Sequence, residues 1–62
     1  MQLKLERIKR GMTQKELAEK SGVSRNLISK IENGEFESIS YKKMEKLSQT
    51  LGLSLKQLFF EE

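Results

Sequence analysis

The feature that most constrains this chain is a tripeptide that occurs three times: glycine, an apolar residue, then serine or threonine. Glycine suits the left-handed residue just past a helix end. Serine or threonine suits the N-cap, where the side-chain oxygen accepts a hydrogen bond from a free backbone N–H. Each tripeptide therefore marks the end of one helix and the start of the next. The three copies begin at Gly11, Gly22 and Gly52.

The residues around the expected N-caps indicate the same helix starts independently. Thr13 with Glu16, and Ser54 with Gln57, have the spacing of a capping box. At every expected cap, the residue before it and the residue four positions after it are both apolar, which is the hydrophobic-staple pattern. The caps are Thr13, Ser24, Ser40 and Ser54, and the staple pairs are Met12–Leu17, Val23–Ile28, Ile39–Met44 and Leu53–Leu58.

These starts divide the chain into five short helices. Inside them apolar residues recur at spacings of three and four, and no segment alternates with period two. In the first helix this spacing assigns Leu5 and Ile8 to the buried side. Because helices this short are marginal alone in water, tertiary packing must hold them. The sequence predicts an all-α, compact five-helix bundle, a single domain over residues 1–62, with helices at about 2–10, 13–21, 24–33, 40–51 and 54–60.

Composition excludes most catalytic chemistry. The chain has no cysteine and no histidine, which removes disulfides, thiolate nucleophiles and the common zinc sites. We therefore expect no enzyme, no metal, no cofactor and no small-molecule ligand. The longest apolar run is three residues, Leu58-Phe59-Phe60, too short for a membrane span or a signal peptide, so a cytoplasmic protein is expected.

Charge is distributed unequally along the chain. Residues 1–34 hold eight Lys/Arg and four Glu, a net charge of +4, whereas residues 35–62 hold four Lys and five Glu, a net charge of −1. A basic half joined to a nearly neutral half favours a surface that meets a polyanion, although a solvated helical surface has the same composition.

Residues 13–33 have the layout of a helix-turn-helix, with two helices joined by the tight turn at Gly22 and Val23. Projected at about 100° per residue, the second helix separates an apolar side from a side rich in hydrogen-bonding groups. Arginine pairs with guanine and asparagine with adenine in the major groove of DNA. The polar side holds Arg25, Asn26, Ser29, Lys30 and Asn33, and the opposite side holds Ser24, Leu27, Ile28 and Ile31.

The run TQKELAEKSGVSRNLISKIENG, from Thr13 to Gly34, closely resembles the Cro/repressor-type (XRE-like) helix-turn-helix family, and the likeness continues to Leu58 and Phe59. The resemblance implies a lambda-repressor-like DNA-binding domain with the helix-turn-helix at the second and third helices. It further implies a small transcriptional regulator of bacterial or phage origin, and a repressor is expected. Such a protein binds double-stranded DNA sequence-specifically by laying its recognition helix in the major groove.

The resemblance also implies residue roles. Arg25, Asn26 and Lys30 match base-reading positions, with Ser24 and Ser29 beside them. Positions that face the DNA phosphates are matched by Thr13, Gln14 and Asn33, and Gln14 is also expected to brace the recognition helix. Arg7 and Glu32 match a salt bridge between the first helix and the recognition helix.

The loop after Gly34 departs from the family, because relatives usually have basic residues and a proline there. Here it reads Glu35-Phe36-Glu37-Ser38-Ile39, and acids near phosphates would repel them. Either this loop turns away from DNA or the affinity is modest. Lys42 and Lys43 would then supply phosphate contacts from the fourth helix. Phe36 would plug the loop onto the core or stand at a protein interface.

Family members often dimerise through C-terminal helices, which makes Phe60 a candidate dimer contact, together with Tyr41 or Phe36, in a homodimer on a palindromic operator.

One alternative to DNA binding is a protein-interaction module on the same scaffold, an antitoxin or anti-repressor, which the acidic loop and Glu61-Glu62 favour. The other is the N-terminal DNA-binding domain of a longer regulator.

Overall fold

The computed structural model describes residues 2–35 and 39–60, and within these ranges it is built from five helical elements without a strand. The predicted all-α class is thus confirmed. Expectations that fall on Phe36, Glu37, Ser38, Glu61 and Glu62 lie outside the described residues. The elements are α1 (Leu3–Lys9), α2 (Gln14–Ser21), α3 (Arg25–Glu32), α4 (Tyr41–Leu51) and the π-type turn η1 (Lys56–Phe60).

The expected caps fix the helix starts. The Thr13 Oγ1 accepts the Glu16 N–H at 3.0 Å, and the Glu16 carboxylate accepts the Thr13 N–H at 2.9 Å, so the capping box is closed. Ser54 and Gln57 form the same reciprocal pair. At the end of α2, Gly22 adopts the left-handed conformation with φ of 77°, which glycine accommodates at least cost.

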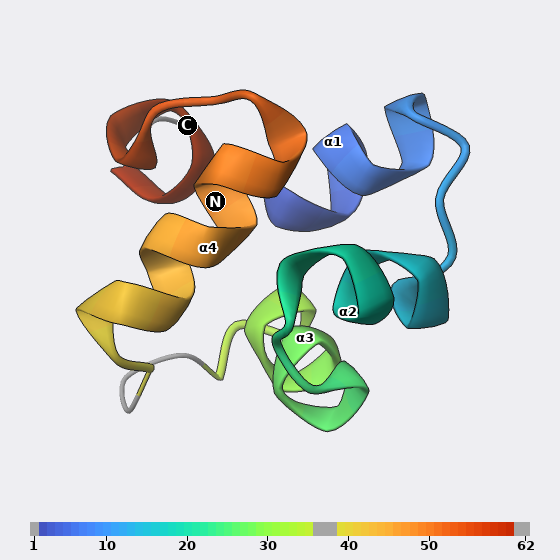
Figure 1. The fold of residues 1–62 in the computed structure, drawn as a ribbon. Coiled ribbons are helices and arrows are strands. Elements are labelled where there is room, and N and C mark those ends of the chain that lie inside the picture. The colour runs from blue at the N-terminus through green and yellow to red at the C-terminus, as the bar shows by residue number, and fades with distance from the viewer. Residues whose placement is uncertain (1, 36–38, 61–62) are drawn as a thin grey trace.

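The helices are arranged so that α2 lies against both α3 and α4, while α1 packs on α3 (Figure 1). The two helices of the helix-turn-helix lie together in the lower part of the view. The beginning and end of the described chain are also joined, because the Gln2 N–H donates to the Leu58 carbonyl at 2.9 Å. This bond fastens the start of α1 to η1.

The staple residues build much of the core. Leu17, Val23, Ile28 and Leu58 are buried, and their staple partners pack against them or are buried with them. Helix starts and core are therefore specified by the same residues. The buried apolar residues are Leu3, Leu17, Val23, Ile28, Ile31, Leu47, Leu51, Leu58 and Phe59.

The prediction for the buried side of α1 was wrong. Leu5 and Ile8 are 55% and 54% exposed, and the inward side of α1 carries Leu3 and Arg7. The inward positions include an arginine because its guanidinium meets a carboxylate and a carbonyl from other elements. Apolar spacing alone identified the wrong side, since it gives no weight to a buried charged residue.

Leu3→Ala and Leu5→Ala form a matched pair on one short helix. Leu3 is fully buried, so its truncation should lower the free energy of unfolding by about 2–5 kcal/mol. Leu5 is more than half exposed, so its truncation should change stability by less than about 0.5 kcal/mol. Urea unfolding followed by circular dichroism measures both, and equal effects would contradict the orientation of α1.

Candidate nucleic-acid interface

The helix α3 is anchored on one side and open on the other. Ile28 and Ile31 are fully buried, so they fix the rotation of the helix about its axis. Arg25, Asn26 and Lys30 are exposed, and Ser29, which lies between them on the outward side, is half-buried. The structure therefore brings four of the expected base-reading side chains together on one exposed helical surface.

The start of α3 is held by the turn that precedes it. The Val23 N–H donates to the Ser21 Oγ at 3.2 Å, and the Val23 side chain is 2% exposed. Ser24 is the N-cap, and its Oγ accepts the Leu27 N–H at 3.1 Å. A serine hydroxyl retains its own O–H as a donor while it accepts. Ser24 thus has a capping role and keeps a proton to donate.

The end of α3 is held by a Schellman motif. The Gly34 N–H donates to the Ile31 carbonyl at 3.0 Å, and the Glu35 N–H donates to the Lys30 carbonyl at 2.8 Å. Gly34 has a φ of +86°, in the left-handed region that this motif requires. The chain therefore folds back at Gly34, and the backbone of Glu35 is fixed against the last turn of α3.

A three-helix network surrounds the Glu32 carboxylate at the end of α3. Arg7 Nε donates to Glu32 Oε2 at 2.8 Å and Arg7 Nη2 donates to Glu32 Oε1 at 3.2 Å, which is the salt bridge expected from sequence. Gln14 Nε2, from the first turn of α2, donates to Glu32 Oε1 at 3.0 Å. One carboxylate thus connects α3 to both α1 and α2.

The network keeps Glu32 ionised. Burial raises the pKa of the Glu32 carboxyl, but hydrogen bonds from Arg7 and Gln14 and the charge of Arg7 outweigh burial, so the pKa lies below the ordinary 4.5. The Glu32 side chain is 3% exposed, and the charges of the pair are largely removed from water. Separation of α1 from α3 would leave each charge of this pair without its partner, which costs stability. The pair therefore holds the two helices in position.

The expected phosphate-facing residues occupy two places. Thr13 and Gln14 stand at the start of α2, and the Gln14 amide uses one of its two N–H groups in the bond to Glu32. Lys42 and Lys43 are exposed in the first turn of α4. Asn33 is exposed at the C-cap of α3, with its backbone N–H bonded to the carbonyls of the preceding turn.

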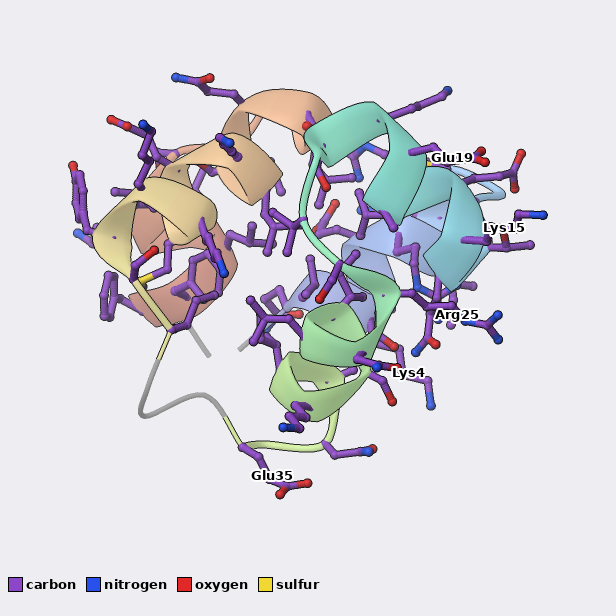
Figure 2. All side chains as sticks on the ribbon, turned by 60° about the horizontal axis from the view of Figure 1, so that its bottom comes forward. Lys4, Lys15, Glu19, Arg25 and Glu35 are labelled. Atoms are coloured by element: carbon purple, nitrogen blue, oxygen red, sulfur yellow. The ribbon has the colours of Figure 1, made fainter. Side chains whose placement is uncertain are left out.

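The cations on the outward side of α3, Arg25 and Lys30, have no acidic partner within the part of the chain that the structure describes. The ion pairs there are Arg7–Glu32, Lys9–Glu6 and Arg10–Glu6, so Arg25 and Lys30 take part in none of them. Figure 2 shows Arg25 and Lys15 extending into solvent along one edge of the view, and Glu35 projecting beyond the end of α3. The outward side of α3 is cationic at Arg25 and Lys30, and Glu35 adds an acidic group just past the end of the helix.

Sequence reasoning did not assign a role to Arg10. Its Nη2 donates to the Leu51 carbonyl at 2.7 Å, and its Nη1 donates to the Glu6 side chain at 2.7 Å. Arg10 thereby joins α1 to the C-terminal end of α4. Arg7 also donates through Nη1 to the Met12 carbonyl at 2.7 Å. Basic residues near a helix end were the available signal, but sequence spacing does not reveal carbonyl partners in other elements.

Comparison with known proteins defines the class of this chain. A family model described as helix-turn-helix matches residues 3–58. The chain therefore belongs to the Cro/repressor-type (XRE-like) helix-turn-helix family and is a DNA-binding regulator of that type. A search of curated proteins and a search of solved structures each found no significant match.

Two further observations concern the described residues only. None of the helices in residues 2–35 and 39–60 has the length and apolar character needed to cross a bilayer. In the same ranges, no group of three or more acidic side chains is placed to hold a metal ion.

The stability supplied by Glu32 should depend on pH. Because the folded-state pKa is lowered, ionised Glu32 stabilises the fold above about pH 4.5, and this contribution is lost as the pH falls through the folded pKa. Glu32→Gln should therefore lose roughly 2–3 kcal/mol of unfolding free energy near neutral pH. The difference from the wild type should shrink as the pH falls below about 4.5.

Urea unfolding at a series of pH values measures this difference. The matched control is Glu19→Gln, an exposed acid on α2 that joins no ion pair of the described residues. A Glu32→Gln deficit that stayed constant from neutral to acidic pH would contradict the role given to the ionised carboxylate.

Proposed function

We propose that this protein binds double-stranded DNA sequence-specifically as a small transcriptional repressor, with α3 seated in the major groove. The observation that carries the proposal is the outward surface of α3. Arg25, Asn26 and Lys30 are exposed side by side on a helix whose opposite side is fully buried at Ile28 and Ile31. The major groove of B-form DNA is wide enough to admit an α-helix. Occupation of a promoter by such a protein excludes other proteins from the same groove.

The side chains on this surface divide the work by chemistry. Arg25 has a planar guanidinium suited to the O6 and N7 atoms of guanine, and Asn26 has an amide suited to the N6 and N7 atoms of adenine. Lys30 offers a point charge for guanine or for a phosphate. Ser29 is short and half-buried, so it allows close approach of the helix to the bases. Ser24, exposed at the N-cap, adds one hydroxyl donor to this set.

The phosphate contacts are proposed for groups on either side of α3. Gln14 begins α2, where free backbone N–H groups and the helix dipole favour an anion, and Thr13 precedes it. Its second amide N–H supports the same contact. Asn33 is proposed as a contact just past α3, and the exposed Lys42 and Lys43 as contacts from α4. Such contacts set register and orientation without reading sequence.

A homodimer on a palindromic operator is proposed for the assembly. Two recognition helices would then meet half-sites about 34–36 Å apart, or a multiple of this spacing. Phe60 is 68% exposed at the end of η1, while the preceding Phe59 is buried in the core. An exposed aromatic residue on a well-anchored turn is suited to the centre of an isologous contact.

Arg25→Ala tests the base-reading role. Selection of bound sequences from a random duplex pool should yield a palindromic consensus for the wild type. The variant should lose preference at one position of each half-site, at a cost of about 1–3 kcal/mol for the preferred base. Binding is measured by fluorescence anisotropy on the selected duplex and on duplexes altered at single positions.

Lys42→Ala is the matched control for the Arg25 experiment. Because Lys42 is proposed as a phosphate contact, its replacement by alanine should lower affinity equally for every sequence and reduce the slope of log K against log salt by about one. If Arg25→Ala behaves in this uniform manner, Arg25 does not read a base. A wild-type affinity that is insensitive to salt would overturn DNA binding as the function.

Phe60→Ser tests the dimer. Removal of the exposed ring should weaken self-association at least tenfold while leaving the unfolding free energy within about 0.5 kcal/mol of the wild type, because the ring contributes little to the core. Sedimentation velocity at several concentrations measures the change. An identical concentration dependence for variant and wild type would remove Phe60 from the interface.

A further inference from the structure

The residue that follows the recognition helix carries the opposite charge from the helix itself. Glu35 is exposed, and within the described residues it joins none of the ion pairs. Figure 2 shows its side chain projecting away from the body of the protein beyond the C-terminal end of α3. Its charge is therefore not neutralised by the part of the chain that the structure describes.

The position of Glu35 is fixed by the Schellman motif. Its backbone N–H donates to the Lys30 carbonyl at 2.8 Å, and Gly34 turns the chain with a φ of +86°. In this motif the side chains at the positions of Lys30 and Glu35 commonly lie against each other, usually as an apolar pair. In this protein those positions hold a cation and an anion that form no ion pair, so an unpaired carboxylate stays at the end of α3 wherever the helix is placed.

Placement of α3 in the major groove brings this carboxylate close to the phosphates that border the groove. Charges within about 8–10 Å of each other interact appreciably at moderate salt. A carboxylate cannot accept a proton from a phosphodiester, so its interaction with the backbone is repulsive. Phosphate interactions do not depend on base sequence, so this repulsion acts on all sequences.

We infer that Glu35 is a negative determinant of DNA affinity, lowering binding to duplexes of every sequence by opposing the phosphate backbone beside Lys30. This inference rests on the proposed function. The protein then binds DNA less tightly and with weaker salt dependence than its cationic recognition surface alone would give. Exchange between sites is faster as a result, because lower affinity in one interface is expressed mostly in dissociation.

Glu35→Gln and Glu35→Lys test the inference by removing and reversing the charge. Glu35→Gln should bind the selected duplex and an unrelated duplex about three- to tenfold more tightly at about 0.1 M salt, with a steeper log–log salt slope, and Glu35→Lys more tightly still. The gain should diminish at about 0.5 M salt. Both variants keep the backbone bond to Lys30, so circular dichroism melting curves should match the wild type.

Glu19→Gln is the matched control, because it makes the same change in net charge at an exposed residue of α2 that lies far from Glu35 in Figure 2. Affinity of Glu35→Gln no higher than that of Glu19→Gln would overturn the inference. Weaker binding of Glu35→Gln confined to duplexes with cytosine at one position would also overturn it, because Glu35 would then accept a hydrogen bond from a base. Failure of the wild type to bind any duplex would instead refute the proposed function.

Discussion

The carboxylate of Glu32 connects α3 to both helices that precede it, because its two oxygen atoms accept hydrogen bonds from α1 and from α2. Arg7 and Gln14 donate to these oxygens from α1 and α2, at distances between 2.8 and 3.2 Å. The apolar contacts of Ile28 and Ile31 fix how α3 rotates about its axis, whereas the Glu32 network fixes where its far end lies. The proposed role of α3 in reading DNA needs both constraints, because a small error in the placement of the helix changes every base contact at once. The same network places the first residue of α2, Gln14, beside the end of α3.

The basic residues of this protein fall into two groups: some bond to other parts of the fold, and others are proposed to contact DNA. Two cations bond to other elements of the fold: Arg7, on α1, joins it to α3, and Arg10, at the C-cap of α1, joins it to α4. The cations proposed for DNA, such as Arg25 and Lys30, take part in no ion pair of the described residues, and they remain available to a polyanion. Glu35 places an exposed acidic group just past the end of the surface proposed to meet DNA. The net charge of +3 conceals this arrangement, because it sums residues with different roles.

Much of this organisation could be predicted from sequence because helix starts obey local rules. Thr13, Ser24, Ser40 and Ser54 accept the backbone N–H groups expected of N-caps, and the staple residues beside them enter the core. The outward side of α3 followed from helical periodicity once Ile28 and Ile31 were placed inside.

The buried side of α1 could not be predicted in this way. There an arginine faces inward and Leu5 faces solvent, because Arg7 has hydrogen-bonding partners 5 and 25 residues away. The contact between Arg10 and the Leu51 carbonyl was missed for the same reason, since it depends on how α1 meets α4.

The central claim is that the exposed side of α3 is the surface that meets DNA. Titration of the ¹⁵N-labelled protein with its selected duplex, followed by NMR, tests this claim most directly. We expect the largest shifts on the amides of Asn26, Ser29 and Lys30 and on the side-chain N–H of Arg25, with smaller shifts at Gln14 and Lys43. Shifts concentrated on Leu5 and Ile8 of α1, with α3 unchanged, would contradict it.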